Sequence, residues 1–504
     1  MIMNVKTYKD KVRGCWLGKN IGGTLGAPFE LKRGVWDLDF YTQDMSEGAW
    51  PNDDLDLQLI WLNAAERYGR NVNAQILGEY WLSYIVGDWS EYGAGKNNLQ
   101  KGLLPPVSGW YHNHNRDSCG AFIRSEIWAC LNPGNPADAV KYAYEDAIVD
   151  HSNEGVYAEI FCAALQSAAF AECDRDTLIK IGLSYIPEDC GIRRAVNAAL
   201  DSYKNGLDWK AARKKVLQTE PGSFGMMAGY EDREPEPDVP VGSKGYDAPS
   251  NIGLMIIGWM YGEGDFGRSL CIAAGCGEDG DCTAGTLGAI LGILAGAGGL
   301  PDKWTAPVGD GIKTISIDCT KWILSVPKTV SELTERVCAL APVFLGKNCV
   351  TMLEEGAEIV MSEGGDLFGG SLADVKELLK KQPFGIRQSG VAFDITLTYL
   401  SGVNIREGED VRFTVEADNR IYRQQWLNFR WFLPEGWEAP GGREFTANLD
   451  QLGGGYGTLY LETSICPRGI SKGEYTVVLE ISSQGRPSRM YLPLTFLNNP
   501  QELR

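Results

Sequence analysis

Histidines, paired cysteines and long apolar runs are scarce in this sequence of 504 residues. Only three histidines occur, and the 13 cysteines include no C-x-x-C pair, which argues against structural zinc. No uncharged apolar run approaches the roughly 20 residues that span a bilayer, so we expect no membrane association. Charges near the N-terminus interrupt the apolar stretch that a secretory signal needs. We therefore expect a soluble, cytoplasmic protein with reduced thiols.

Positive charge is also in short supply. The chain has 47 Lys and Arg residues against 66 Asp and Glu residues, for a net charge of −19. Nucleic acid would be repelled by this surplus, so we expect no nucleic-acid partner. An anionic ligand would need local help from metal ions or helix N-termini. The sequence does not indicate the oligomeric state.

Two different spacings of apolar residues divide the sequence into two parts. From about residue 8 to about 380, apolar residues recur at threes and fours, as one face of an α-helix requires. After Gly390 the apolar residues alternate with polar ones in short segments separated by turn residues, which is typical of a β-sandwich. We therefore predict two domains, a helical domain over 1–384 and a β-sandwich over 390–504.

Two clusters of carboxylates offer the clearest chemistry, and each opens a predicted helix. Asn52, Asp53 and Asp54 form the first, and Asp279 and Asp281, behind Glu278, belong to the second. A single Asp at such a place usually caps the helix and interacts with its dipole. Capping uses one side chain per helix, however, and leaves the remaining carboxylates unexplained.

The alternative interpretation of these clusters is a metal site. If the two helix starts met in a partly buried place, the mutual repulsion of their carboxylates would cost several kcal/mol unless protons or cations neutralised them. Mg²⁺ prefers oxygen ligands, and two such ions bridged by a carboxylate could bind substrate hydroxyls and hold a water molecule. From spacing alone, capping and metal binding both stay open.

Three segments, in this order, give a resemblance to a known family. "VRGCWLGKNIGGTLGAPFE" (12–30), "NDD" (52–54) and "EDGDCTAGTLGAILG" (278–292) are similar to the signature segments of the ADP-ribosylglycohydrolase family. The resemblance covers about residues 8–310. It implies an all-α orthogonal helix bundle with a binuclear site for two divalent cations, Mg²⁺ or Mn²⁺.

The resemblance also assigns residues. It implies a catalytic set of Glu30, Asp53 and Asp281, with Glu30 matching an active-site glutamate of relatives. The metal ligands that it implies, with Thr283 as a further candidate, are Asn52, Asp53, Asp54, Asp279, Asp281 and Thr283. The segments "DHSNEG" (150–155) and "SCGAF" (118–122) resemble substrate loops. Their candidate substrate contacts are His151, Glu154, Gly120 and Ser118.

The sequence departs from the family pattern in three places. Cys282 stands where many relatives have a metal-binding threonine, and a thiol suits Mg²⁺ poorly, so either Thr283 contributes or one ion keeps an extra water. Gly23 stands where relatives often carry Asp. The third departure is the C-terminal sandwich, whose "FLPEGWEAP" (432–440) is similar to a turn of immunoglobulin-like accessory domains. Three tryptophans of the predicted sandwich are candidates either for stacking on sugars or for the sandwich core. These are Trp426, Trp431 and Trp437.

The resemblance implies metal-assisted hydrolysis of an N- or O-glycosidic bond at an anomeric carbon. The Asp residues would act mainly as ligands, and Glu30 would act as general base or gate. The first candidate substrate is an ADP-ribosylated protein or small molecule. A glycosidase that acts on another sugar or glycan with the same metal centre is the second candidate. A non-catalytic relative similar to a lens crystallin is the third.

Overall fold

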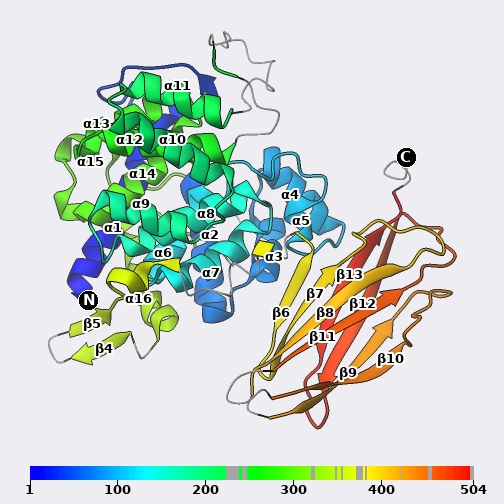
Figure 1. Cartoon of the computed structure of the whole chain (residues 1–504). Helices are drawn as coiled ribbons and strands as arrows, with labels where there is room; N and C mark the ends of the chain where they lie inside the picture. The colour runs from blue at the N-terminus through cyan, green and yellow to red at the C-terminus, as the bar shows by residue number, and fades with distance from the viewer. Residues whose placement is uncertain are drawn as a thin grey trace. The chain divides into compact units, whose positions relative to one another are not determined.

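The computed structural model describes residues 1–222, 238–240, 247–318, 324–346, 349–353, 356–369, 379–380, 383–421, 423–451 and 457–499. Contacts divide the chain into two units, drawn in Figure 1. The first contains Met1–Gly95 and His112–Glu377, and the second contains Lys96–Tyr111 and Leu378–Arg504. A helical region followed by a β-sandwich is thus confirmed. None of the described helices is long and apolar enough to cross a membrane.

The helices have the following bounds. The first eight are α1 (Val5–Gly26), α2 (Asp53–Tyr68), α3 (Ala74–Tyr84), α4 (Ser90–Gln100), α5 (Val107–Trp110), α6 (Glu126–Leu131), α7 (Pro136–Ala147) and α8 (Glu154–Ala168). The others are α9 (Arg175–Ser184), α10 (Gly191–Lys204), α11 (Trp209–Thr219), α12 (Ala248–Tyr261), α13 (Phe266–Gly275), α14 (Gly280–Ala295), α15 (Asp302–Val308) and α16 (Val330–Leu345).

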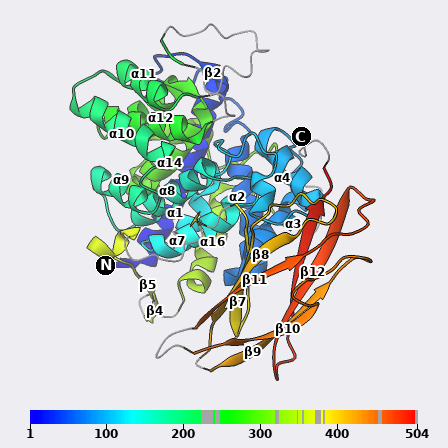
Figure 2. The ribbon, with the colours of Figure 1, turned by 45° about the vertical axis from the view of Figure 1, so that its right-hand side comes forward.

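Helices α1 and α14 form the centre of the helical unit and lie side by side along their lengths (Figure 1 and Figure 2). Small residues every four positions make this possible, and they pair in antiparallel order. The pairs are Gly14 with Gly292, Gly18 with Gly288, Gly22 with Ala284, and Gly26 with Gly280. A Cβ atom added at Gly18 would overlap the carbonyl oxygen of Gly288. The two backbones therefore touch, and the C-terminal end of α1 is fixed against the first turn of α14.

Short strands hold the loop after α1 in place. Strand β2 (Lys32–Arg33) pairs antiparallel with β3 (Gly277–Glu278), so Lys32 lies opposite Glu278. This pairing brings Glu30 next to the start of α14. Elsewhere in the unit, β1 (Ile2–Asn4), β5 (Gly356–Val360) and β4 (Val350–Leu353) form a three-stranded sheet. The helical periodicity did not predict these small sheets.

The second unit contains two four-stranded antiparallel sheets. One has the order β10-β9-β12-β13 and the other β11-β8-β7-β6. Alternation along β9 buries Leu427, Phe429 and Trp431, so Trp431 is core. Trp437 is core as well, whereas Trp426 is 50% exposed. The strands are β6 (Gly385–Ser389), β7 (Phe393–Tyr399), β8 (Val411–Asn419), β9 (Gln425–Phe432), β10 (Glu444–Leu449), β11 (Thr458–Ile465), β12 (Glu474–Ser483) and β13 (Met490–Leu497).

A short segment from the helical part of the sequence belongs to this second unit. Leu103, Val107 and Tyr111 join the hydrophobic core of the sandwich. The Tyr111 hydroxyl donates a hydrogen bond to Asn404 Oδ1 at 3.2 Å. The segment 96–111 is therefore an element of the β unit that precedes the sandwich strands by almost 300 residues.

Candidate metal centre

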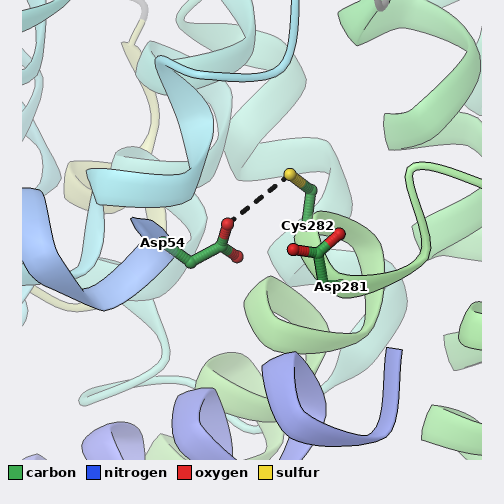
Figure 3. Close-up of side chains that lie close together, drawn as sticks. All are labelled: Asp54, Asp281 and Cys282. Atoms are coloured by element: carbon green, nitrogen blue, oxygen red, sulfur yellow. Dashed lines mark hydrogen bonds between the residues drawn. The ribbon is translucent and has the colours of Figure 1, made fainter. Parts of the chain in front are cut away.

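The two predicted carboxylate clusters lie together in the structure. Asn52 caps α2 by accepting a hydrogen bond from the Asp54 backbone N–H at 2.7 Å, and its amide Nδ2 donates to Asp281 Oδ2 at 3.2 Å. The Cys282 thiol donates to Asp54 Oδ1 at 3.6 Å (Figure 3). The first turn of α14 therefore faces the first turn of α2, although more than 220 positions separate them in sequence.

Two groups of side chains in the described part of the chain are arranged to hold a metal ion, and they share one residue. The first group is Asp54, Asp281 and Cys282, and the second is Glu30, Asp279 and Asp281. Within each group, one donor atom per residue lies within 4.8 Å of the others. Asp281 is thus placed to serve both positions, as a bridging carboxylate would.

Asp281 has a further property that fits a cation. It is only 4% exposed, and its Oδ1 atom is buried without a hydrogen-bond partner among the described residues. A buried carboxylate oxygen without a partner costs free energy unless a proton or a cation neutralises it. The donor set is mostly carboxylate oxygen, which hard divalent cations prefer. The carboxylates therefore fit the metal ions that the family resemblance implies, whereas the Cys282 thiol of the first group does not.

The electrostatics of the cluster point the same way. Burial, together with the charges of Glu30 and Asp54, raises the pKa of Asp281 well above its usual value. Burial likewise raises the pKa of Asp279. Loss of hydration around its carboxylate, with the charges of Asp279, Asp53 and Asp54, raises the pKa of Glu30 to about 8, although the residue as a whole is exposed. The raised pKa values mean that these carboxyl groups favour the protonated form, because nearby positive charge does not offset their negative charges.

Asp53 is in neither group. It is half-buried, and its Oδ2 atom accepts a hydrogen bond from the Tyr92 hydroxyl at 2.9 Å. Burial and the charge of Asp54 raise the pKa of Asp53 to about 7, against the opposing effect of Tyr92. Asp53 therefore stands beside the two metal-binding groups, oriented by a residue of α4.

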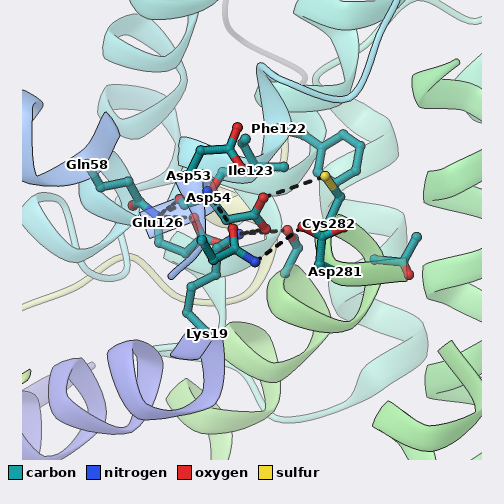
Figure 4. Close-up of polar contacts among 12 residues, drawn as sticks. Lys19, Asp53, Asp54, Gln58, Phe122, Ile123, Glu126, Asp281 and Cys282 are labelled. Atoms are coloured by element: carbon teal, nitrogen blue, oxygen red, sulfur yellow. Dashed lines mark hydrogen bonds and ion pairs between the residues drawn. The ribbon is translucent and has the colours of Figure 1, made fainter. Parts of the chain in front are cut away.

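Lys19 supplies positive charge on one side of the cluster (Figure 4). Its Nζ atom lies 3.2 Å from Asp54 Oδ2 and 3.4 Å from Glu126 Oε1, and the side chain is 1% exposed. Burial alone would lower its pKa, but the charges of Asp54 and Glu126 raise it above its usual value. Gln58 donates to Glu126 Oε2 at 2.8 Å and so extends the network. One lysine thus balances part of Asp54 and leaves Asp279 and Asp281 unbalanced.

Two further acids from the same sequence segments have protein partners away from these two groups. Glu278 is buried and accepts hydrogen bonds from Arg33 Nε at 2.6 Å and Arg33 Nη2 at 3.1 Å. Asp56 Oδ2 accepts hydrogen bonds from the backbone N–H groups of Ile315 and Ser316, both at 2.7 Å. Neither acid belongs to a candidate metal-binding group, although Asp56 Oδ1, like Asp281 Oδ1, is buried without a hydrogen-bond partner among the described residues.

The remaining family-implied positions near the cluster have clear surroundings. Thr283 is buried, and its hydroxyl donates to the Gly280 carbonyl at 3.1 Å, within its own helix. At Gly23, an added Cβ atom would lie 2.8 Å from Asn52 Nδ2. The Asn52 side chain therefore occupies the space that an aspartate would take there. Asn52 orients Asp281 and Asp54 through its amide, and its role as a ligand stays a prediction.

The two predicted substrate loops also lie together, and Gly120 of one loop lies close to Tyr92. Ser118 Oγ and His151 Nε2 share a hydrogen bond of 3.0 Å, and His151 Nδ1 lies 2.9 Å from Asp150 Oδ1. At Gly120 an added Cβ atom would overlap Glu91 Oε1. Ser118 and His151 are fully buried. These side chains support the loop, and a direct contact with substrate stays a prediction.

Glu154 has a different partner from the other three. Its two carboxylate oxygens accept hydrogen bonds from the N–H groups of Gly191, at 2.8 Å, and Ile192, at 3.1 Å. It therefore caps the start of α10, where a carboxylate is favourable.

Sequence reasoning missed several residues of this region. Lys19, Tyr92, Glu91, Glu126 and Asp150 all contact a residue of the cluster or of the substrate loops. Only Asp150 carried a local signal, since it precedes His151 in the quoted loop segment. The others are recruited from separate helices, so no spacing in the sequence reveals them.

Comparison with known proteins adds the following. The model of the ADP-ribosylglycohydrolase family matches residues 4–340. Among solved structures, a chain described as "ADP-ribosylglycohydrolase-related protein complex" is similar at 18% identity and a TM-score of 0.43. That match covers 67% of this chain and 98% of the other, but its structural similarity is too low to carry an argument. No curated protein matches the chain.

Proposed function

The chain belongs to the ADP-ribosylglycohydrolase family, and from this premise we propose that it is a metal-dependent hydrolase. Its proposed reaction is hydrolysis of an N- or O-glycosidic bond at the anomeric carbon of an ADP-ribosylated protein or small molecule. The observation that supports it most is the position of Asp281, which is buried, has an unpartnered oxygen and is common to both metal-binding groups.

The proposed cofactors are two divalent cations, Mg²⁺ or Mn²⁺. Asp54 and Asp281 would hold one, and Glu30, Asp279 and Asp281 would hold the other. When bound, such ions supply positive charge that offsets the carboxylates and can hold sugar hydroxyls and a water molecule. Thr283, Asn52 and Asp53 remain candidates for further ligands.

The residues of the chain have distinct proposed tasks. Glu30, which is exposed, would act as general base or gate when its carboxylate is not engaged in coordination. Asp53, held by Tyr92, places a second carboxylate beside the reacting sugar. Nearby negative charge favours the oxocarbenium-like transition state of glycoside hydrolysis. Lys19 and Asn52 fix Asp54 and Asp281, the two acids that face each other.

A second candidate function is hydrolysis of a larger glycan, supported by the outer face of the sandwich. Trp426 and Tyr491 are each 50% exposed, and Phe432 is 43% exposed. Asn428 and Arg430 lie between Trp426 and Phe432 on β9, and Asn428 pairs with Thr446 of β10. Exposed aromatic faces with neighbouring amide and hydroxyl groups suit contacts with neutral sugars. A non-catalytic role fits poorly, because a structural protein has no use for a costly unbalanced carboxylate cluster.

Release of ADP-ribose tests the proposal. Chelator-stripped protein would be incubated with arginine-linked or serine-linked ADP-ribose, with and without Mg²⁺, and free ADP-ribose measured by chromatography. We expect Mg²⁺-dependent release that is lost in Asp281→Asn and kept in Asp176→Asn, whose carboxylate is exposed on α9. Cleavage of a neutral glycoside alone would favour the second candidate. If no glycosidic bond is cleaved by protein that binds Mg²⁺, the hydrolase proposal is wrong.

A further inference from the structure

We propose that the two cation positions around Asp281 are chemically different. Cys282 would make the Asp54–Asp281–Cys282 position a site for a thiophilic divalent ion such as Zn²⁺, while the Glu30–Asp279–Asp281 position keeps Mg²⁺ or Mn²⁺. This inference rests on the proposed function, because it divides the same metal centre into two unlike halves.

The geometry of Cys282 is the first support. Its sulfur belongs to the same group as carboxylate oxygens of Asp54 and Asp281, with all three donor atoms within 4.8 Å of one another (Figure 3). The thiol is 7% exposed and is directed at Asp54 Oδ1, 3.6 Å away. No sulfur belongs to the Glu30–Asp279–Asp281 group, so a sulfur donor distinguishes the first position, although the Cys119 thiol contacts both Cys282 and Asp279.

Asp281 gives the second, independent support. One of its oxygens, Oδ2, accepts from Asn52, and the other, Oδ1, is buried without a hydrogen-bond partner among the described residues. The side chain is 4% exposed, so bulk water does not satisfy that oxygen. A cation bound through Asp281, which belongs to the Cys282 group, would satisfy it. An acidic cluster whose oxygens were all hydrogen-bonded would not need one.

Donor chemistry decides which ion this ligand is. Thiolate sulfur selects soft or borderline ions such as Zn²⁺ and Cd²⁺, whereas an all-oxygen set suits Mg²⁺ or Mn²⁺. Binding breaks the S–H bond of Cys282: the sulfur lone pair goes to the metal, and the proton goes to solvent. Three protein donors leave a zinc ion with an open position, which is the pattern of catalytic rather than structural zinc sites.

Charge around this position is compatible with a divalent ion. Asp54, Asp281 and a Cys282 thiolate would bring three negative charges, and Lys19 lies 3.2 Å from Asp54 Oδ2. The lysine, which Glu126 shares, offsets only part of this charge, so a divalent cation is favoured here. Glu126, on the far side of Lys19, contacts its Nζ at 3.4 Å and keeps it in place.

Cadmium reports this site directly, because a cadmium–thiolate bond has an ultraviolet charge-transfer band that oxygen ligands do not give. Chelator-stripped, reduced, full-length protein would be titrated with Cd²⁺ while the difference spectrum is recorded. We expect a band that saturates at one ion per chain in the wild type and persists when excess Mg²⁺ is added. Excess Zn²⁺ should displace Cd²⁺ and remove the band, which tests the site without any substitution.

Two variants locate the sulfur. Cys282→Ser should abolish the band and weaken Cd²⁺ binding by more than about 100-fold, since loss of even an outer partner of a ligand costs about 10–100-fold. Cys173→Ser is the matched control, because Cys173 is an exposed cysteine outside the site and the variant should keep the band. Asp281→Asn should also weaken Cd²⁺ binding.

The outcomes separate this inference from the proposed function. A band that is absent from the wild type, or that survives in Cys282→Ser, overturns the inference. If calorimetry then still shows Mg²⁺ binding that depends on Asp281, the proposed metal centre stands and only the assignment of Cys282 is wrong. If Mg²⁺ binding is absent too, both proposals are wrong.

Discussion

Two buried groups of acids in the helical unit differ in how their charge is balanced. In one group, Arg124 Nε donates to Asp146 Oδ1 at 2.8 Å, and Arg124 Nη2 donates to Asp150 Oδ1 at 2.5 Å. In the other, Asp279 and Asp281 have no such arginine among the residues that the structure describes. Both groups are almost completely removed from solvent.

The pKa values reflect this difference. Burial would raise the pKa of Asp150, but Arg124 and His151 hold it below its usual value. Burial and neighbouring carboxylates raise the pKa of Asp281 well above its usual value. Burial and the charge of Asp146 raise the pKa of a third acid near Arg124, Glu159, well above its usual value. Arg124 balances Asp146 and Asp150 but leaves both Glu159 oxygens without a hydrogen-bond partner among the described residues, whereas Asp281 has no arginine there and needs protons or cations.

The same contrast appears within four residues of one segment. Glu278 and Asp281 are both buried acids at the start of α14, yet Glu278 has Arg33, and Asp281 has no arginine in the described part of the chain. Negative charge in a sequence therefore does not by itself indicate a cation site. A buried carboxylate without a protein cation is the more specific indication.

Breaking the balanced group should have the largest effect. Arg124→Met leaves Asp146 and Asp150 buried without their cation, which should lower the free energy of unfolding by about 3–5 kcal/mol. Chemical denaturation measures this. Arg268→Met, which breaks an exposed pair with Glu263, should cost less than about 1 kcal/mol. A similar small loss for Arg124→Met would mean that the group does not depend on its arginine.

Binding of a cation to the unbalanced group, Asp279 and Asp281, should stabilise the protein. Mg²⁺ at about 100 times its dissociation constant should add about 2.7 kcal/mol to the free energy of unfolding of chelator-stripped protein. The gain should vanish in Asp281→Asn and persist in Arg268→Met. Equal stabilisation of Asp281→Asn would place the bound ion outside this cluster. Denaturation with and without Mg²⁺ gives the answer.

The unbalanced group should make the stability of metal-free protein fall as pH rises, and Asp146 of the Arg124 group, whose pKa burial raises to about 6, should act in the same direction. Burial first, then nearby carboxylates, raise the pKa of Asp53 to about 7 and of Glu30 to about 8. The stability from such groups is complete below their unfolded values and is lost as pH rises through the folded values. Asp150, whose pKa is lowered, contributes stability that is lost as pH falls. Metal-free protein should therefore lose stability from about pH 5 to about pH 8, and Mg²⁺ should reduce that loss.

Urea denaturation across that pH range, with and without Mg²⁺, measures both effects. An Asp53→Asn variant should flatten the slope of the metal-free protein, while Asp176→Asn should leave it unchanged. Stability that rises over this range without metal would contradict the assignment of a proton-loaded cluster.

Removing the Tyr92 hydroxyl, which orients Asp53, should have the smallest effect. Tyr92→Phe removes the hydroxyl that donates to Asp53 Oδ2 at 2.9 Å but leaves both metal-binding groups unchanged. We expect activity and Mg²⁺ affinity to fall by no more than about 10-fold, the lower end for an outer partner. Titration calorimetry and the hydrolysis assay check this. A loss above about 100-fold would make Asp53 a direct ligand in its own right.

Much of the fold was predictable because it depends on local periodicity. The change from a period near four to a period of two separated the helices from the sandwich strands, and repeated small residues marked the close packing of α14. The segment 96–111 was not predictable, since its apolar residues fit a helical unit equally well and only tertiary packing assigns Val107 to the sandwich. The small pairing of β2 with β3 is too short for any periodicity.

The candidate site was predictable only in part. Asp residues at two helix starts gave a signal, and the family resemblance placed Glu30 beside them. The sequence could not distinguish Glu278 from Asp281, because their difference depends on where Arg33 lies in space. In the sequence, nothing distinguishes Lys19 from the other residues of α1. In the fold, α14 packs closely against the glycines of α1, and Lys19 is buried against Asp54.

Calorimetric titration of Mg²⁺ into chelator-stripped wild-type protein, Asp281→Asn and Asp176→Asn tests the central claim, that the unbalanced carboxylates are a cation site. We predict binding heat for the wild type and for Asp176→Asn, and none for Asp281→Asn. No heat in the wild type, or unchanged affinity in Asp281→Asn, would contradict it.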